Sequence, residues 1–228
     1  MPPENTGATP TQSRKRRRKP ALRRGLRSAL KPREKRALNI PLLTQRPIAL
    51  VGLMGVGKTT VGRRLAKTLE LPFYDSDEEI ETASGRTVAG YFRDHGEAEF
   101  RAGERRVIAR LLSNKPLVLA TGGGAFIPED TREILQNGAL TVFLKGDFDT
   151  LFARVSKKNT RPLLQVDDPR STYKELMDMR YPIYEKAQIT VNIAKGPHER
   201  TVKKVIQALE RHYVKASKDE TKRARGSS

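Results

Sequence analysis

A glycine-rich segment, Gly52–Thr59, has the composition and spacing of a loop that binds phosphate. Its sequence, Gly-Leu-Met-Gly-Val-Gly-Lys-Thr, matches the pattern G-x-x-x-x-G-K-[ST] and lies between an apolar run and a helical stretch. Glycines let successive backbone N–H groups converge on a phosphate, and the N-terminus of the following helix adds partial positive charge. Lys58 would reach the β- and γ-phosphates of a nucleotide, and the Thr59 hydroxyl would bind Mg²⁺. The loop therefore predicts a bound nucleotide with Mg²⁺ but says little about the acceptor.

Two carboxylates, Asp75 and Asp77, end a short apolar run with the sequence Phe-Tyr-Asp-Ser-Asp. Ligands gather at the carboxyl ends of parallel strands, and strand alternation would point both side chains to the same side. One carboxylate would bind Mg²⁺, directly or through water, and the other would accept a hydrogen bond from a substrate hydroxyl and act as its base. The alternative for such a pair is a helix cap, with Asp77 capping the next helix.

Three arginines suit an anionic acceptor when they are taken as a set, although each alone is typical of a protein surface. Two guanidinium groups can hold a carboxylate in fork geometry, and a third on a lid can neutralise charge on a transferring phosphoryl group. A glycine triplet adds a stretch of backbone that a ligand can approach closely. The arginines are Arg101, Arg161 and Arg180, and the triplet is Gly122–Gly124.

Short apolar runs that alternate with longer amphipathic stretches, from about residue 47, must position these side chains. This pattern predicts a mainly parallel sheet with helices on both faces. The predicted strands are Ile48–Gly52, Phe73–Asp75, Leu117–Thr121, Leu140–Leu144 and Ile189–Ile193. The predicted helices are Lys58–Glu70, Asp77–Ser84, Val88–Asp94, Glu97–Ser113, Pro128–Gln136, Phe148–Ser156, Thr172–Lys186 and Pro197–His212. A mobile loop is expected at residues 157–170.

The positive charge lies mostly at the two ends of the 228-residue chain, whose formal net charge is +19. Residues 1–40 hold 13 Lys and Arg against 2 Asp and Glu, and residues 215–228 hold 5 against 2. Such a basic, apolar-poor segment cannot offset its ordering entropy, so residues 1–45 and 214–228 are predicted to be disordered. The central domain, residues 46–213, is only mildly basic, which weakens an interpretation as a nucleic-acid-binding domain.

The basic N-terminal extension leaves alternatives open. Leu22, Leu26 and Leu30, spaced by four among arginines, would form a short amphipathic helix on an acidic surface. An organellar transit peptide is also compatible with the Arg-rich composition, although the unbroken basic run Arg14–Lys19 fits it poorly. The chain has no cysteine, which excludes disulfides and thiolate metal sites. No apolar run approaches the roughly 18–20 residues of a membrane span, so we expect a cytoplasmic protein without membrane contact.

Six pieces of the chain, in order over about residues 47–210, resemble a shikimate kinase. The first, Gly-Leu-Met-Gly-Val-Gly-Lys-Thr-Thr-Val-Gly-Arg, is common to many phosphate-loop proteins. The others are more specific to the family: Phe-Tyr-Asp-Ser-Asp-Glu-Glu-Ile-Glu, Gly-Glu-Ala-Glu-Phe-Arg, Ala-Thr-Gly-Gly-Gly-Ala, Asn-Thr-Arg-Pro-Leu-Leu and Arg-Tyr-Pro-Ile-Tyr. Two departures are a slightly shorter segment after Tyr184 and the basic extension, which lies outside the family core.

The resemblance implies both a fold and a reaction. The fold is an α/β phosphate-loop fold like that of nucleoside-monophosphate kinases, with a five-stranded parallel sheet flanked by helices and a mobile lid at about residues 157–170. The reaction is ATP-dependent phosphorylation of the 3-hydroxyl of shikimate, which gives shikimate 3-phosphate and ADP on the route to chorismate. The implied cofactors are ATP and Mg²⁺, and a monomer is expected. Contact with nucleic acid or another acidic surface is expected only through the basic tail.

The resemblance also implies roles for individual residues. Asp77 would contact the acceptor hydroxyls as the candidate base, Arg101 and Arg180 would hold the shikimate carboxylate, and Gly123 would lend its backbone to the substrate. Arg161 would be the lid arginine that reaches the phosphates.

On the nucleotide side, Asp75 would support Mg²⁺ beside Thr59, and Arg154 resembles the position that stacks on adenine. A nucleotide contact near Lys195 is left open, because the alignment there has a length difference. The nucleotide would also be bound by Gly55, Val56, Gly57, Lys58, Thr59, Thr60 and Arg161. The expected catalytic residues are Lys58, Asp77 and Arg161.

Three other functions account for parts of the sequence. A gluconate or nucleotide kinase would share the phosphate loop, but the Asp-x-Asp, Gly-Glu-x-x-Phe-Arg and Arg-x-Pro-x-Tyr pieces together argue against it. A nucleic-acid-associated phosphate-loop protein would use residues 14–36 as a basic arm, but the chain lacks aromatic stacking motifs and a helicase-like second domain. A catalytically dead relative is disfavoured, because the expected reactive side chains are all present: Lys58, Asp77, Arg101, Arg161 and Arg180.

Deletion of residues 1–40 separates the kinase from the nucleic-acid hypothesis. If the extension lies outside the catalytic domain, the shortened protein should keep its rate of ADP formation, because no expected site residue is removed. Loss of that activity from a protein that still folds, as judged by circular dichroism, would instead favour a working basic arm.

Overall fold

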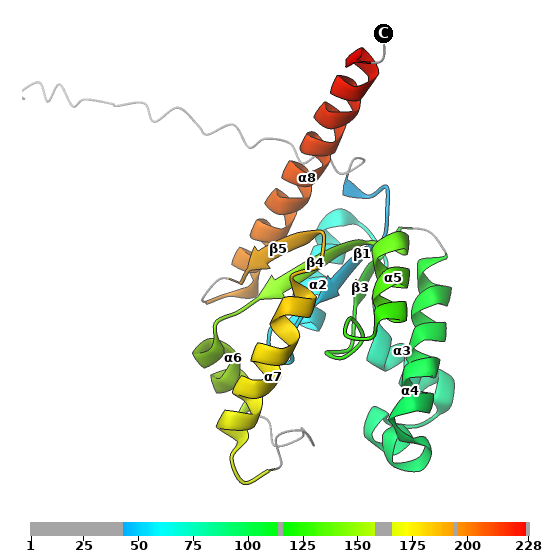
Figure 1. Cartoon of the computed structure of the whole chain (residues 1–228), viewed down its shortest axis with the longest axis vertical. Helices are drawn as coiled ribbons and strands as arrows, with labels where there is room; N and C mark the ends of the chain where they lie inside the picture. The colour runs from blue at the N-terminus through cyan, green and yellow to red at the C-terminus, as the bar shows by residue number, and fades with distance from the viewer. Residues whose placement is uncertain (1–42, 114–115, 158–165, 194–195, 227–228) are drawn as a thin grey trace, which may run out of the picture. The chain divides into compact units, whose positions relative to one another are not determined.

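Five short apolar runs form one parallel sheet in the computed structural model of the protein (Figure 1). The strands are β1 (Ile48–Val51), β2 (Phe73–Asp75), β3 (Val118–Ala120), β4 (Leu140–Lys145) and β5 (Ile189–Asn192). Their order is β2-β3-β1-β4-β5, and each neighbouring pair runs parallel. The predicted α/β fold with a five-stranded parallel sheet is therefore confirmed.

The structure describes residues 43–113, 116–157, 166–193 and 196–226, with side chains as far as Asp219. The chain divides into two units, Met1–Ala37 and Leu38–Ser228, and every described residue belongs to the second. Residues 1–42 of the predicted basic extension, the lid arginine Arg161 and Lys195 lie outside the described residues. The predicted boundary of the extension at residue 45 is wrong, because Leu43 is described and buried in the core.

Helices connect consecutive strands and cover both faces of the sheet (Figure 1). The chain moves from β1 to β2 in one direction across the sheet and from β3 to β4 in the other. Right-handed crossovers therefore place α2 and α5 on opposite faces, and α8 packs beside α2. The helices are α2 (Lys58–Leu69), α3 (Ser76–Ser84), α4 (Val88–Leu112), α5 (Glu129–Gly138), α6 (Phe148–Val155), α7 (Pro169–Tyr184) and α8 (His198–Gly226).

Strands β1 and β3 are buried along their whole length, as parallel strands covered on both faces must be. All four residues of β1 and all three of β3 are buried. The predicted helices Val88–Asp94 and Glu97–Ser113 form one element, α4, that kinks at Gly96, where φ is 79°. Glycine tolerates this left-handed conformation, so the chain turns there without a side-chain clash.

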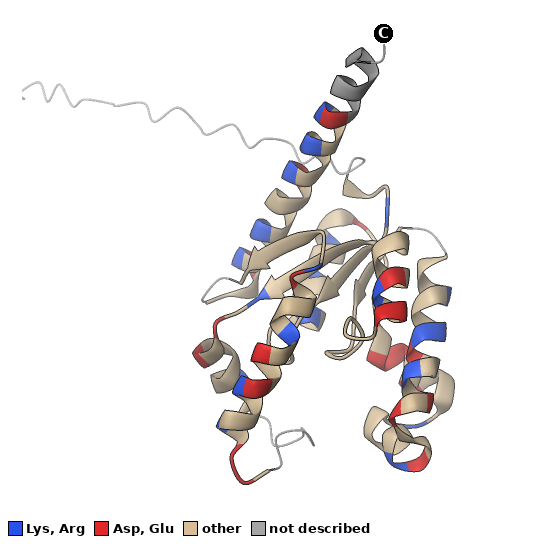
Figure 2. Cartoon of the chain, in the orientation of Figure 1, with Lys and Arg blue, Asp and Glu red and all other residues tan. Residues whose placement is uncertain are grey.

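The helices after the predicted lid and at the C-terminus differ from expectation. Helix α7 begins at Pro169, inside the predicted loop, because Asp168 caps it by accepting from Arg170 N and Ser171 N. Helix α8 continues to Gly226, so its predicted end at His212 is wrong, and so is the predicted disorder of the tail from residue 214 as far as Gly226. Residues 213–226 are rich in Lys, Arg and Ala and lack Pro, and a formed helix extends readily through such residues. Figure 2 marks the positions of Lys and Arg in blue and of Asp and Glu in red along α8. Among all the helices that the structure describes, none is both long enough and apolar enough to cross a membrane.

Candidate active site

The segment Gly52–Thr59 forms a tight loop between β1 and α2 that needs glycine at three positions. Gly52, Gly55 and Gly57 have φ values of 139°, 83° and 91°, which disfavour other residues. Space is also lacking, because a Cβ atom on Gly52 would lie 2.8 Å from the Leu144 carbonyl oxygen. The sequence of the loop therefore fixes its backbone conformation.

Lys58 places a positive charge over this loop. Its Nζ donates to the carbonyl oxygens of Gly52 at 2.7 Å and Leu53 at 3.3 Å. Helix α2 begins at the same residue, with Gly57 as its N-cap. The ammonium group and the helix N-terminus together form a site for an anion. Of the other predicted loop residues, Val56 is buried and Thr60 is exposed in the first turn of α2.

Asp75 connects this loop to the neighbouring strand β2. Its Oδ2 accepts a hydrogen bond from Thr59 Oγ1 at 2.7 Å, and its Oδ1 accepts from Asp77 N at 3.1 Å. The structure thus makes Asp75, and not Asp77, the cap of α3, because the chain is still extended at Asp75. Asp75 therefore brings its carboxylate to the Thr59 hydroxyl while its backbone ends the strand.

Asp77 lies beside the glycine triplet in a poorly solvated position. Burial raises the pKa of Asp77 above its ordinary range, and Asp75 adds to the rise, whereas Lys58 and Arg101 oppose it. Its Oδ1 lies 2.6 Å from where a Cβ atom on Gly122 would be. A carboxylate with a raised pKa accepts a proton more readily, so Asp77 is suited to act as a base.

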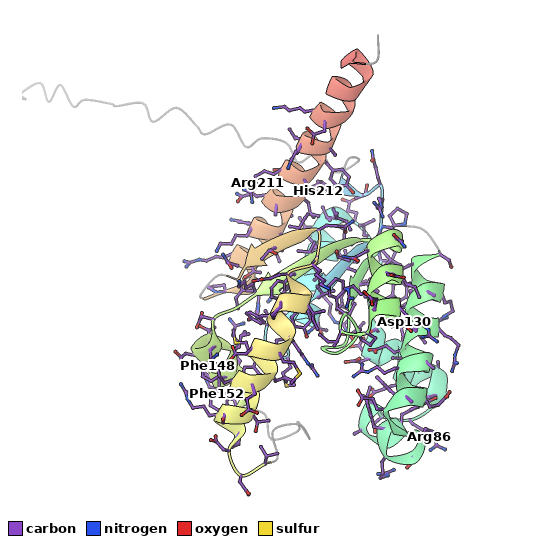
Figure 3. The ribbon with its side chains drawn as sticks, in the orientation of Figure 1. Arg86, Asp130, Phe148, Phe152, Arg211 and His212 are labelled. Carbon is purple, nitrogen blue, oxygen red and sulfur yellow. The ribbon has the colours of Figure 1, made fainter. Side chains whose placement is uncertain are left out.

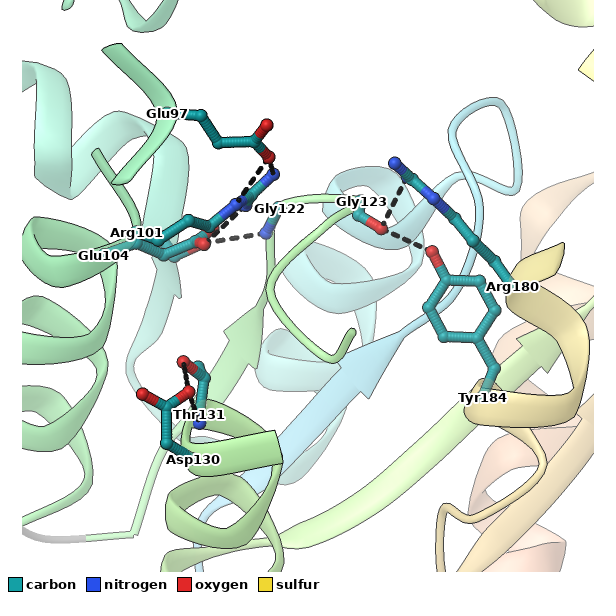
Figure 4. A network of polar contacts seen from close by, with 10 residues as sticks. Glu97, Arg101, Glu104, Gly122, Gly123, Asp130, Thr131, Arg180 and Tyr184 are labelled. Atoms are coloured by element: carbon teal, nitrogen blue, oxygen red, sulfur yellow. Dashed lines mark hydrogen bonds and ion pairs between the residues drawn. The ribbon is translucent and has the colours of Figure 1, made fainter. Parts of the chain in front are cut away.

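Arg101 is held by a buried carboxylate, Glu104, that the sequence reasoning missed. Arg101 NH1 donates to Glu104 Oε2 at 2.7 Å, and its Nε and NH2 donate to Glu97 Oε1 at 3.3 and 3.2 Å (Figure 4). Glu104 is only 1% exposed, and burial raises its pKa although Arg101 opposes the shift. Its second oxygen, Oε1, has no hydrogen-bond partner among the described residues. The sequence signal that could have indicated this ion pair is the three-residue spacing of Arg101 and Glu104 on one helix.

Arg180 approaches the glycine triplet from the opposite side to Arg101 (Figure 4). Its NH1 donates to the Gly123 carbonyl oxygen at 3.3 Å, and the Tyr184 hydroxyl donates to the same oxygen. Burial raises the pKa of Tyr184 to about 12, so the hydroxyl keeps its proton at neutral pH. A Cβ atom on Gly124 would lie 2.5 Å from Arg101 NH2, so the triplet fits closely between the two arginines.

Two further side chains contact the phosphate loop from outside. Arg154 NH1 donates to the Gly55 carbonyl oxygen at 3.4 Å, which places this predicted nucleotide residue beside the loop. His198 was not predicted as a site residue. Its Cε1 atom lies 3.1 Å from the position that a Cβ atom on Gly57 would occupy. Burial lowers the pKa of His198, and Arg154 and Arg64 lower it further.

The structure therefore brings the described site residues together at the carboxyl end of the sheet. The loop Gly122–Gly124 lies next to the phosphate loop, since a Cβ atom on Gly123 would lie 3.7 Å from Met54 N. The residues that converge there are Lys58, Thr59, Asp75, Asp77, Arg101, Gly123, Arg154 and Arg180.

Comparison with known proteins identifies the family of the chain that carries this site. The family described as shikimate kinase matches residues 54–210, which is more than half of the chain. The chain belongs to the shikimate kinase family. The shikimate kinase of Bartonella henselae is 49% identical over 178 residues, covering 78% of this chain and 84% of that protein. The shikimate kinase of Caulobacter vibrioides is 50% identical over 172 residues, covering 75% and 86%.

Solved structures agree with this membership of the shikimate kinase family. A shikimate kinase from Acinetobacter baumannii, in complex with shikimate, is 39% identical with a TM-score of 0.69, covering 74% of this chain and 95% of that one. A shikimate kinase from Bacteroides thetaiotaomicron is 34% identical with a TM-score of 0.68, covering 72% and 98%. A gluconokinase from Sinorhizobium meliloti, at 21% identity and a TM-score of 0.51, shares the fold alone.

The substitution Asp77→Asn should raise stability while it lowers activity. Because the pKa of Asp77 is raised in the folded state, ionisation of this carboxyl at pH 7 costs folding free energy, and the amide removes that cost. Tm at pH 7 should therefore rise, and kcat should fall about 100-fold or more with the loss of a base. The gain in Tm should vanish below about pH 4, where the acid is protonated in both states.

The control for this experiment is Glu78→Gln, which neutralises an exposed carboxylate on the same helix that pairs with Arg63. It should leave kcat nearly unchanged and should not raise Tm. A drop in Tm for Asp77→Asn at pH 7 would contradict the account of this site.

Proposed function

We propose that this protein transfers the γ-phosphoryl group of ATP to the 3-hydroxyl of shikimate, giving shikimate 3-phosphate and ADP. The observation that carries this proposal is the placement of a carboxylate and two arginines around one glycine triplet beside the phosphate loop. Asp77 suits a hydroxyl, and Arg101 and Arg180 suit a carboxylate, which together are the groups that shikimate presents. The Acinetobacter baumannii relative solved with shikimate supports the same acceptor.

The donor side fits an Mg²⁺-bound nucleotide. The Thr59 hydroxyl and the Asp75 carboxylate supply hard oxygen ligands next to the anion site formed with Lys58, and these are the ligands that Mg²⁺ prefers. No cluster of three or more potential metal-binding side chains occurs in the described part of the chain, so phosphate and water oxygens would supply the remaining ligands. When bound, Mg²⁺ neutralises charge on the β- and γ-phosphates.

The chain's own groups supply positioning and a proton acceptor. Arg101, fixed by Glu104, and Arg180 orient the shikimate carboxylate, so that one hydroxyl faces the phosphate loop. The proton of that hydroxyl passes to the Asp77 carboxylate. We propose that Arg161 approaches the phosphates from a lid at about residues 157–170, which would also exclude water. We also propose a catalytic domain at residues 46–213. The monomeric state, the cytoplasmic location and the role of the basic extension stay predictions.

A coupled assay of ADP release tests the acceptor. The full chain should release ADP fastest with shikimate when quinate, gluconate and nucleoside monophosphates are offered side by side with MgATP. Lys58→Ala serves as the control, because it should abolish release with every acceptor. Faster release with gluconate or a nucleotide would refute the proposed substrate.

A further inference from the structure

Helix α7 presents three tyrosines to three different loops at the carboxyl edge of the sheet. The hydroxyl of Tyr173 donates to the Met54 carbonyl oxygen at 2.8 Å, and that of Tyr181 donates to the Gly146 carbonyl oxygen at 2.5 Å. The hydroxyl of Tyr184 donates to the Gly123 carbonyl oxygen. One rigid helix is thus bonded to the loops that follow β1, β4 and β3.

Tyr173 is bonded to the phosphate loop itself. It is 0% exposed, and its ring packs against Phe148 and Phe152, with centroids 6.0 and 5.9 Å away. Figure 3 shows Phe148 and Phe152 side by side on α6, and their rings are stacked with centroids 5.7 Å apart. Because this packing fixes the ring, the hydroxyl is held at one place on the loop.

The bond to Met54 also sets the direction of a neighbouring donor. A trans peptide unit is planar, so its C=O and N–H groups point in opposite directions. With the Met54 carbonyl turned toward Tyr173, the Gly55 N–H must point away from α7. Backbone N–H groups of such a loop are the donors that cradle phosphate, so Tyr173 fixes one of them.

Tyr184 constrains the backbone of the loop after β3 in the same way. Its ring is stacked on Phe143, with centroids 5.3 Å apart, and the Gly123 carbonyl also accepts from Arg180. The adjacent Gly124 N–H is therefore turned away from Arg180 and Tyr184, in the loop that packs against Arg101.

Tyr181 provides an internal comparison on the same helix. Its hydroxyl donates to the Gly146 carbonyl and accepts from Gly146 N at 3.3 Å, and burial raises the pKa of Tyr181 to about 12. Its ring meets Phe143 edge-on. The atoms nearest to a Cβ atom on Gly146 would belong to Leu151 and Ile193, neither of which is a residue of the proposed site.

We propose that Tyr173 and Tyr184 are positioning residues with separate ligands, Tyr173 for the nucleotide phosphates and Tyr184 for the acceptor acid. Through them α7 holds the two loops in a fixed relation, whereas Tyr181 contributes to stability alone. This inference rests on the proposed function for the identity of the acceptor but not for the nucleotide.

The experiment measures the affinity of the full chain and of three variants, Tyr173→Phe, Tyr181→Phe and Tyr184→Phe, by calorimetric titration with MgADP and with shikimate. Each variant keeps its ring and loses one neutral hydrogen bond, so Tm should fall by about 2–4 °C in all three. Tyr173→Phe should weaken MgADP binding by roughly three- to ten-fold and leave shikimate binding unchanged. Tyr184→Phe should do the reverse, and Tyr181→Phe should change neither affinity.

Three outcomes would overturn the inference: MgADP binding by Tyr173→Phe that equals that of the parent, shikimate binding by Tyr184→Phe that equals it, or a comparable loss of affinity in Tyr181→Phe. If the parent binds MgADP but no shikimate, the proposed function is wrong, and so is the role inferred for Tyr184. The MgADP titrations would still test the role inferred for Tyr173.

Discussion

The close approach of charged side chains to three residues without side chains, Gly122–Gly124, is the constraint on which the site depends. The carboxylate of Asp77 and the guanidinium of Arg101 occupy space that Cβ atoms would otherwise fill. A Cβ atom on the middle residue, Gly123, would lie 3.7 Å from Met54 N, so the triplet lies next to the backbone of the phosphate loop. A phosphoryl group that passes between the two loops therefore has only a short distance to cross.

The close packing of charged groups in this site costs folding free energy, and neighbouring cationic side chains reduce that cost. Glu104 is buried and Asp77 is partly buried, and both have raised pKa values, so their ionisation disfavours the folded state. Arg101 opposes both shifts, and Lys58 opposes that of Asp77. A chain selected for stability alone would place apolar groups here, and the retained charges mark the site as functional.

Much of the fold could be predicted from the sequence, because it rests on local patterns. The β2 strand was predicted with its observed ends, and α2 within one residue, and the loop glycines before α2 mark its start. Residue chemistry alone suggested that Arg101 and Arg180 belong to a site for an anionic acceptor, but the specific roles of Asp77, Arg101 and Arg180 came from resemblance to a family, since no local pattern relates residues so far apart in the chain.

What the sequence reasoning missed depends on tertiary contacts or on competition between neighbours. Tyr173 and Met54 lie 119 residues apart, and nothing near either one indicates the bond between them. The role of Glu104 comes from its burial, which its position on an amphipathic helix does not reveal. Asp75 rather than Asp77 caps α3, because the helix begins at Ser76, two residues earlier than a cap at Asp77 would allow.

The crowding at the triplet is tested most directly by the affinity of Gly124→Ala for shikimate, with Gly103→Ala as the control. A Cβ atom at position 124 would lie 2.5 Å from Arg101 NH2, whereas one at position 103 would meet nothing closer than 3.8 Å. Displacement of a charged hydrogen-bond donor predicts that Gly124→Ala weakens shikimate binding by roughly ten-fold or more while MgADP binding is unchanged. Parent-like affinity for shikimate in Gly124→Ala would contradict this account of the site.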